Sequence, residues 1–415
     1  MTRVPLQYIV EGGHRLTGTI EPAGNKNAAL PIIAAALLTE HPVTLENVPR
    51  IRDTETLVEL IRSVGASAEW RQRNTLAIHA KSIRAADLDP ALCARIRASI
   101  LLAGPLLARC GEVMLPPPGG DVIGRRRLDT HFLAFEQLGA TVVATDRLEF
   151  RAARLKGADV FLDEPSVTAT ENALMAAVAA HGTTHLRNVA SEPHVQDLAH
   201  FLVALGARIE GIGTNTMVVH GPATLGGTSY SIGPDHIEVG SLIGLAAVTR
   251  SPLRINRAGV EHLRSIRMGF ERLGIVCEVD GEDLVVPSGQ TLKIRDDFGG
   301  HVPKLEDQPW PAFPADLMSI AVALGRRHDG DRHQVGREGN PVRRRDPDVR
   351  EDVRVPDVLR RQADLDGCPH RAVRSAPGDR GRAEPPQGRA DDIARHSRRH
   401  GHAAGRGMRQ GRQHH

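Results

Sequence analysis

One pattern of apolar and polar positions recurs four times in the first 280 residues. Each copy is an amphipathic stretch that ends in a glycine and is followed by a strand-like run. The four glycines are Gly65, Gly139, Gly206 and Gly274, at spacings of 74, 67 and 68 residues. A glycine directly after the last periodic residue is typical of a helix that ends in a left-handed cap. The pattern therefore predicts repeated helix–strand units of about 70 residues.

A second landmark in each unit is a helix built mainly from small apolar residues. Such stretches cover residues 27–38, 97–108, 171–180 and 239–248, and a fifth covers residues 313–324. Alanine and glycine allow helices to approach closely, so we expect these helices to be buried together. Short alternating runs, such as residues 43–48 and 183–189, are typical of strands. Each unit is thus predicted to be a mixed α/β module.

Composition narrows the class of protein. A chain of 415 residues is too long for one ordinary core and favours two domains. No run of about 18 apolar residues is present, and the N-terminus has no signal-peptide pattern, so we expect no membrane segment. The cysteines are scattered and form no CxxC pair, which favours reduced thiols in a cytoplasmic protein without a metal site.

The last 90 residues differ sharply from the rest. Residues 1–325 carry 31 basic and 36 acidic side chains, whereas residues 326–415 carry 22 arginines, no lysine and 14 acidic side chains. This C-terminal segment has no aromatic residue, two leucines and one isoleucine. Such a segment buries too little apolar area to offset its conformational entropy. We therefore expect residues 326–415 to be disordered.

Two candidate binding motifs stand at the starts of small-residue helices. GNKN, residues 24–27, leads into the first helix, where backbone amides and Lys26 favour an anion and Asn27 could cap the helix or bind a ligand. Arg97 opens the second helix and could hold a phosphate through two parallel hydrogen bonds. Taken singly, each is better explained as an ordinary helix start with a solvated cation.

Two carboxylates are candidates for proton transfer. Asp121 lies in the Pro- and Gly-rich loop PPPGGDVIGRRRLD, which is typical of a mobile lid, and it could act as a general acid if closure desolvates it. Asp316 opens the fifth small-residue helix and could serve as an N-terminal cap, the commoner role, or as a general base. GxGxxG, GxxxxGK[ST], HExxH and GxSxG motifs are absent from the sequence.

Together these pieces are specific. GNKN, RASILLAGPLLAR, PGGDVIGRRRLDTH, SVTATENALMAA and FPADLM follow one another in an order and spacing that resembles the UDP-N-acetylglucosamine 1-carboxyvinyltransferases, which are enolpyruvyl transferases. The resemblance covers about residues 5–325. It implies an inside-out α/β barrel fold of two domains, each made of three βαβαββ-type modules around buried helices. The first domain would comprise residues 24–234, and the second residues 1–23 and 235–325, with the site between them.

The resemblance also implies the reaction. The 3-hydroxyl of UDP-N-acetylglucosamine attacks C2 of phosphoenolpyruvate, C3 is protonated, and the tetrahedral intermediate expels phosphate, with no metal or cofactor. Positioning and electrostatics would then carry the catalysis.

The resemblance assigns a role to each matching residue. Lys26 and Asn27 would contact phosphoenolpyruvate. Arg97 and Arg126 would bind its phosphate. Asp316 would be the base near the sugar hydroxyl. Ser166 and Val167 would contact the nucleotide.

The family motif is altered at two positions. The family's lid usually presents Cys where this chain has Asp121, and a carboxylic acid there can still donate a proton. In SVTAT, Thr168 stands where the family usually has Gly, so the contacts to the nucleotide are expected to differ in detail.

The family pattern stops near Leu324, and the segment that follows looks frameshifted. When residues 352–367 are back-translated with degenerate codons and one base is dropped, the shifted codons can spell the family's fifth module. The same shift from Arg395 gives its sixth buried helix, starting DIRA. Without these modules, the second domain cannot close its core. We therefore expect this polypeptide to be inactive or unstable.

Three alternative functions remain open. The sister activity, 3-phosphoshikimate 1-carboxyvinyltransferase, shares the fold and chemistry, but GNKN and PGGDVIG argue against it. A nucleic-acid-binding protein could use the Arg-rich segment, although Asp is interleaved with Arg there and aromatic residues are absent. A non-catalytic remnant could still bind the nucleotide sugar.

The lid residue gives the first testable prediction. Fosfomycin acts on this family by alkylating the lid cysteine, and Asp121 offers no thiol. We expect the protein to resist the drug, as measured by intact mass after incubation. Covalent labelling of the lid would contradict this expectation.

Overall fold

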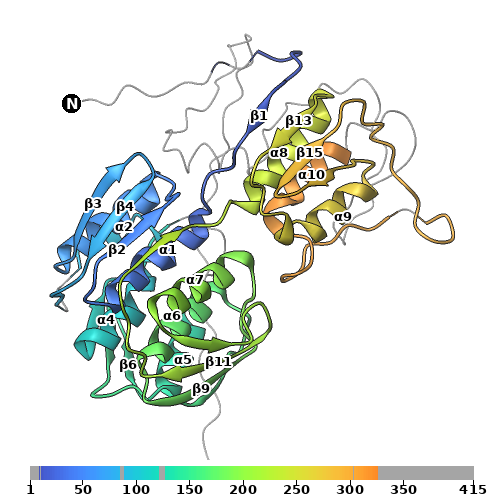
Figure 1. The fold of residues 1–415 in the computed structure, drawn as a ribbon. Helices are drawn as coiled ribbons and strands as arrows, with labels where there is room; N and C mark the ends of the chain where they lie inside the picture. The colour runs from blue at the N-terminus through green and yellow to red at the C-terminus, as the bar shows by residue number, and fades with distance from the viewer. Residues whose placement is uncertain (1–8, 10, 85–87, 121–126, 302, 326–415) are drawn as a thin grey trace, which may run out of the picture. The chain divides into compact units, whose positions relative to one another are not determined.

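The computed structural model describes residues 9, 11–84, 88–120, 127–301 and 303–325 (Figure 1). All statements on the structure below concern these residues. The expected disorder of residues 326–415 falls outside them. In the part of the chain described, no helix is long and apolar enough to cross a membrane.

The five predicted small-residue helices are all present. Most residues of the first and third of these helices are buried, as the small-residue pattern predicts. The third helix begins at Val167, four residues before the predicted start, and the second and fifth open with a 3₁₀ turn. In chain order they are α1 (Lys26–Ala35) with η1 (Ala36–Leu38), η2 (Arg97–Leu102) with α4 (Ala103–Cys110), α6 (Val167–Ala179), α8 (His236–Thr249), and η4 (Ala315–Leu317) with α10 (Met318–Gly325).

The four amphipathic helices also end as predicted. Each is followed by its glycine in the left-handed region, with φ values of 105°, 88°, 116° and 73° in chain order. These values confirm the repeat that the glycine spacing predicts. The helices are α2 (Arg52–Ser63), α5 (Asp129–Gln137), α7 (Pro193–Leu205) and α9 (Arg264–Arg272), and the remaining short elements are α3 (Pro90–Cys93) and η3 (Val260–His262).

Three of the four sheets share one topology. In each of them, the first strand of the sheet order pairs in parallel with the second or the last does so with its neighbour. The other partner of that pair then lies antiparallel to one strand of a β-hairpin. The first such sheet, in the order β12-β2-β4-β3, contains β2 (Val43–Glu46), β3 (Ser67–Gln72), β4 (Thr75–His79) and β12 (Thr228–Ser231). The second, β10-β11-β9-β8, contains β8 (Asp159–Phe161), β9 (Gly182–Arg187), β10 (Arg208–Glu210) and β11 (Thr216–Gly221).

The remaining two sheets complete the set. The sheet β1-β13-β15-β14 contains β1 (Thr19–Ile20), β13 (Leu253–Ile255), β14 (Glu278–Asp280) and β15 (Asp283–Val286). The sheet β5-β7-β6 contains β5 (Glu112–Leu115), β6 (Thr141–Ala144) and β7 (Leu148–Arg151). Repetition of one small sheet with its two helices is the structural counterpart of the sequence repeat.

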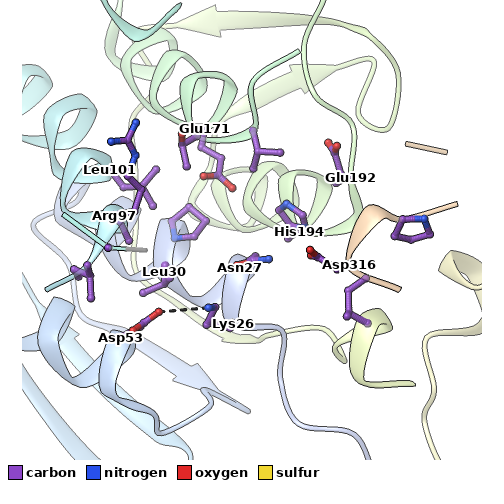
Figure 2. A pocket seen from close by; sticks show the side chains of 18 of the residues that line it. Lys26, Asn27, Leu30, Asp53, Arg97, Leu101, Glu171, Glu192, His194 and Asp316 are labelled. Atoms are coloured by element: carbon purple, nitrogen blue, oxygen red, sulfur yellow. Dashed lines mark ion pairs between the residues drawn. The ribbon is translucent and has the colours of Figure 1, made fainter. Parts of the chain in front are cut away.

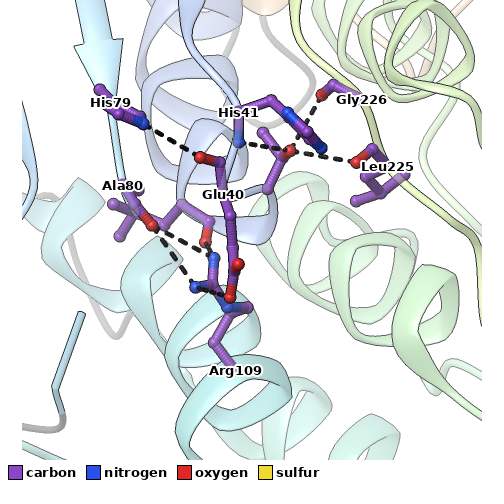
Figure 3. Close-up of polar contacts among 9 residues, drawn as sticks. Glu40, His41, His79, Ala80, Arg109, Leu225 and Gly226 are labelled. Carbon is purple, nitrogen blue, oxygen red and sulfur yellow. Dashed lines mark hydrogen bonds and ion pairs between the residues drawn. The ribbon is translucent and has the colours of Figure 1, made fainter. Parts of the chain in front are cut away.

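The first three modules close on themselves. Strand β12 of the third module pairs with β2 of the first, in the register Thr228 with Val43. Close by, Thr39 donates its hydroxyl hydrogen to the carbonyls of Leu225 and Gly226, at 3.2 and 2.9 Å (Figure 3). The chain therefore returns after three modules to the place where the first began.

Arg109 joins the second module to the first at the same end of α1. Its guanidinium donates to the carbonyls of Leu37 and Ala80 and pairs with Glu40 at 3.2 Å (Figure 3). The side chain is mostly buried, so the carbonyl of Leu37 in η1 and that of Ala80 after β4 are satisfied by a charged donor.

Two separate hydrophobic cores are present. One contains buried residues between Ala28 and Ile232, and the other contains buried residues between Val239 and Leu324. Strand β1 pairs with β13, so the N-terminal segment joins the sheet of the second core. The domain limits at residues 24, 235 and 325 stay a prediction.

The chain passes from one core to the other through a narrow crossing. Gly24 forms a β-bridge with Pro234, and the Asn25 amide donates to the Gly233 carbonyl at 2.9 Å. A Cβ on Gly24 would lie 1.8 Å from the Asn47 carbonyl oxygen, so only glycine fits.

Helix α1 is capped by Asn25, and the suggestion that Asn27 caps it is wrong. The Asn25 side-chain oxygen accepts from the amides of Asn27 and Ala28, at 2.8 and 3.3 Å. Its amide nitrogen lies 3.3 Å from Nδ1 of His236. The Asn27 side chain is left exposed and available to a ligand.

The two asparagines form a matched pair for a stability test. Asn25→Ala removes a buried cap and should lower the melting temperature, with a loss of about 1–2 kcal/mol in the free energy of unfolding. Asn27→Ala changes an exposed side chain and should cost less than about 0.5 kcal/mol. Equal losses in thermal unfolding would contradict the assignment of the cap.

Candidate active site

A cavity of about 1190 Å³ collects most of the residues that the sequence singled out. Lys26, Asn27, Arg97, Val167 and Asp316 all line it (Figure 2). They come from α1, η2, α6 and η4, so four of the small-residue helices contribute an N-terminal end. Backbone amides at helix starts favour anionic ligands, and here several such starts share one cavity.

The other predicted site residues do not line the cavity or are not described. Ser166 is the N-terminal cap residue of α6, but its side chain makes no capping hydrogen bond and it does not line the cavity. Asp121 and Arg126 lie outside the described residues. Asp316 is not a cap either, because Pro314 occupies that position of η4 and Asp316 lies within its first turn.

Lys26 is held by a carboxylate that the sequence motifs did not reveal. Its ammonium lies 3.4 Å from Asp53 of α2, and both side chains are about one-quarter exposed (Figure 2). This ion pair fixes Lys26 at the cavity wall. Because Asp53 precedes no recognisable motif, its role could be seen only once α1 and α2 were placed side by side.

Several further cations face the same space. Arg52 and Arg95 line the cavity with Lys26 and Arg97. The Arg97 guanidinium also donates to the carbonyl of Arg127 at 3.3 Å. Four cations around one cavity suit a substrate with several negative charges.

Two glutamates in the cavity wall are unusual. Glu171 of α6 is 1% exposed, and its Oε1 has no hydrogen-bond partner within the described structure. Burial, together with the nearby Glu192 carboxyl, raises the pKa of Glu171 well above its ordinary value. Burial also raises the pKa of Glu192. Both acids are therefore shifted toward their neutral forms, which spares the cavity negative charge.

An aromatic wall borders the cavity near Asp316. His194 stacks on His236 with ring centroids 6.2 Å apart, and Trp310 meets His236 edge-on at 5.8 Å. Burial lowers the pKa of His194 to about 3 and that of His236 to about 4. Both imidazoles are thus neutral at physiological pH, and they contribute stacking surface and hydrogen bonds instead of charge.

The comparisons with known proteins identify the family of this chain. Residues 10–340 match the family model described as EPSP synthase (3-phosphoshikimate 1-carboxyvinyltransferase). The chain is 86% identical over 326 residues to a UDP-N-acetylglucosamine 1-carboxyvinyltransferase of Bradyrhizobium diazoefficiens, covering 79% of this chain and 76% of the relative. It is 50% identical over 323 residues to the protein of the same name from Treponema pallidum, covering 78% and 76%.

This chain belongs to the UDP-N-acetylglucosamine 1-carboxyvinyltransferase family. Its fold is that of the enolpyruvyl transferases. The enolpyruvyl transferase NikO from Streptomyces tendae superposes with a TM-score of 0.64 at 26% identity, over 76% of this chain and 73% of that one. EPSP synthase from Acinetobacter baumannii, at 18% identity and a TM-score of 0.56 over 67% and 66%, shares the fold. The predicted fold class is confirmed.

The matched length also bears on the C-terminal segment. The 326 residues aligned with the Bradyrhizobium family member leave about a fifth of the chain unmatched. The family model ends at residue 340, which is 15 residues beyond the boundary expected from composition.

Within the described residues, no group of three or more His, Cys, Asp or Glu side chains could hold a metal ion.

The buried Glu171 gives a pH-dependent prediction. Because its pKa is raised in the folded state, its contribution to stability is fully present below the unfolded pKa, about 4.3. That contribution is lost as pH rises through the folded pKa. Glu171→Gln removes this loss, so the variant should gain stability relative to the wild type as pH increases from about 5 to 8.

Thermal unfolding across that pH range is the measurement. Glu136→Gln on α5, where the carboxyl is exposed, serves as the control and should track the wild type at every pH. A constant difference between Glu171→Gln and wild type would show that Glu171 is ionised in the folded protein.

Proposed function

We propose that the cavity transfers the enolpyruvyl group of phosphoenolpyruvate to the 3-hydroxyl of UDP-N-acetylglucosamine, which begins peptidoglycan synthesis. The observation that carries this proposal is the gathering of Lys26, Arg97 and Asp316, far apart in sequence, around one cavity that basic and acidic side chains both line. The names of relatives up to 86% identical support the choice of substrates. Both substrates carry phosphate, which matches the charge of the cavity wall.

The chemistry needs three proton transfers and no redox step. Asp316 takes the proton of the sugar 3-hydroxyl as its oxygen bonds to C2 of phosphoenolpyruvate, and Asp121 delivers a proton to C3. A proton then returns from C3 to the ionised Asp121 and restores the double bond as the C2–O bond to phosphate breaks. The released phosphate takes the proton held by Asp316, which regenerates the base. Arg97, Arg126 and Lys26 stabilise the phosphate charge throughout, while Ser166 and Val167 contact the nucleotide.

The ion pair with Asp53 suits Lys26 to this task. It holds the ammonium in place before phosphoenolpyruvate arrives, so less side-chain entropy is lost on binding. Asn27, freed from capping by Asn25, can direct its amide to the same substrate. We further propose that the protein acts in the cytoplasm and that its activity supports cell shape and division.

A second candidate, a binding protein without turnover, is favoured by one observation. The aligned region spans 76% of the Bradyrhizobium relative, so the rest of that relative has no aligned counterpart in this chain. The site on the first core would then bind nucleotide sugar without completing the transfer.

Turnover by the full chain tests the proposal. Phosphate release from phosphoenolpyruvate should require UDP-N-acetylglucosamine, and shikimate 3-phosphate should not replace it. Asp316→Asn should lower kcat by roughly 10²–10⁴-fold with little change in KM, because it removes a general base. Asp297→Asn, at an exposed position of the same region, should retain full activity.

The outcomes separate the candidates. Turnover with shikimate 3-phosphate would favour the sister activity. Binding of UDP-N-acetylglucosamine without any phosphate release would favour the non-catalytic protein.

A further inference from the structure

A buried line of hydrogen bonds runs from the packed helices to the cavity and ends at Thr168. It passes through Asn172 of α6 and His131 of α5, which are 0% and 1% exposed. Thr168 lines the cavity, one turn before Glu171 on the same helix. The sequence marked Thr168 only as a departure from the family's glycine.

Backbone groups fix the direction of this line at its inner end. The Gly104 amide donates to Asn172 Oδ1 at 2.9 Å, and Asn172 Nδ2 donates to the Ile100 carbonyl at 3.0 Å. A backbone N–H can only donate and a carbonyl can only accept, so the Asn172 amide has one possible orientation. Its second Nδ2 hydrogen points to Nδ1 of His131, 3.1 Å away.

The bond from Asn172 also decides which nitrogen of His131 carries the hydrogen. Burial, reinforced by the charge of Arg97, lowers its pKa to about 3, so the ring is neutral and carries one hydrogen. Nδ1 accepts from Asn172, and the hydrogen therefore sits on Nε2. Nε2 lies 3.1 Å from the Thr168 hydroxyl oxygen and donates to it.

Thr168 is consequently left with a hydrogen to donate. Its oxygen already accepts from His131, and no described residue accepts its hydroxyl hydrogen. The neighbouring Thr170 differs, because it donates to the Ser166 carbonyl and accepts from the Ala190 amide. Thr168 thus presents a donor, next to the first-turn amides of α6, in a cavity lined with cations.

We propose that Thr168 binds the nucleotide-sugar substrate by donating its hydroxyl hydrogen to a diphosphate oxygen, with His131 and Asn172 fixing the direction of that donation. This inference rests on the proposed function. The diphosphate is favoured because Ser166 and Val167, the preceding residues, carry the predicted nucleotide contact, whereas Lys26 and Arg97 face phosphoenolpyruvate. A glycine at this position lacks the contact altogether.

Binding to the full chain tests the proposal without requiring turnover. Dissociation constants of UDP-N-acetylglucosamine, UDP, uridine and phosphoenolpyruvate are measured by calorimetry for wild type, Thr168→Gly, Thr168→Val and Thr168→Ser. Gly and Val should weaken both diphosphate ligands about 10-fold or more, the range for a hydrogen bond to a charged acceptor. Ser should stay within about 2-fold of wild type, and the other two ligands should be unaffected.

Thr170→Val is the matched control. It removes a hydroxyl from the same helix that bonds only to protein, so it should lower the melting temperature and leave all four dissociation constants unchanged. Thr168→Val and Thr168→Gly both remove the acceptor of the His131 Nε2 hydrogen, so both should be less stable. Thr168→Gly leaves space in which a water can accept that hydrogen, and it keeps the test decisive if Thr168→Val does not fold.

Two results would overturn the inference. Wild-type affinity for UDP in Thr168→Gly would show that the hydroxyl contributes nothing, while leaving the proposed function intact. Failure of the wild type to bind UDP-N-acetylglucosamine would remove both the inference and the proposed function for this chain.

Discussion

The close approach of small-residue helices is the constraint on which the site depends. A Cβ on Gly104 of α4 would lie 3.0 Å from two oxygen atoms of Asn172 on α6, so a larger residue there would push the helices apart. This approach is what lets the Gly104 amide reach Asn172 and order the hydrogen bonds that lead to Thr168. Packing in the core therefore sets the chemistry presented at the cavity surface.

The electrostatics of the cavity follow from the same burial. Acidic side chains outnumber the cations in its wall, which would ordinarily disfavour a phosphorylated substrate. Burial shifts Glu171 and Glu192 toward neutrality, and Asp53 is paired with Lys26. The cations are thus less opposed than the composition suggests, because two of the acids are shifted toward their neutral forms and a third is committed to an ion pair.

The sequence predicted the repeat and the buried helices, because glycine caps and apolar periodicity are local signals. The clustering of Lys26, Arg97 and Asp316 was implied only by the family resemblance. The sequence left open whether Asn27 caps α1 or binds a ligand, since Asn25 and Asn27 are equally good caps by residue type and only the backbone at the crossing selects Asn25. Asp53, Glu171 and His131 were missed because their roles arise from contacts with other helices or loops, whose residues lie about 20 to 40 positions away. Such pairings leave no local trace in composition or spacing.

Binding and turnover depend on different parts of the chain. The first core closes within the described residues, because β12 returns to β2 and Thr39 holds Leu225 and Gly226. Lys26, Arg97 and Thr168 all stand on helices of that closed unit. Asp316 stands on η4, whose support comes from the second core, where Leu317 and Ile320 pack against Gly240 and Gly244 of α8. In that core the described residues form a single sheet. Destabilising the second core should therefore displace Asp316, the proposed base, before it affects Lys26, Arg97 and Thr168.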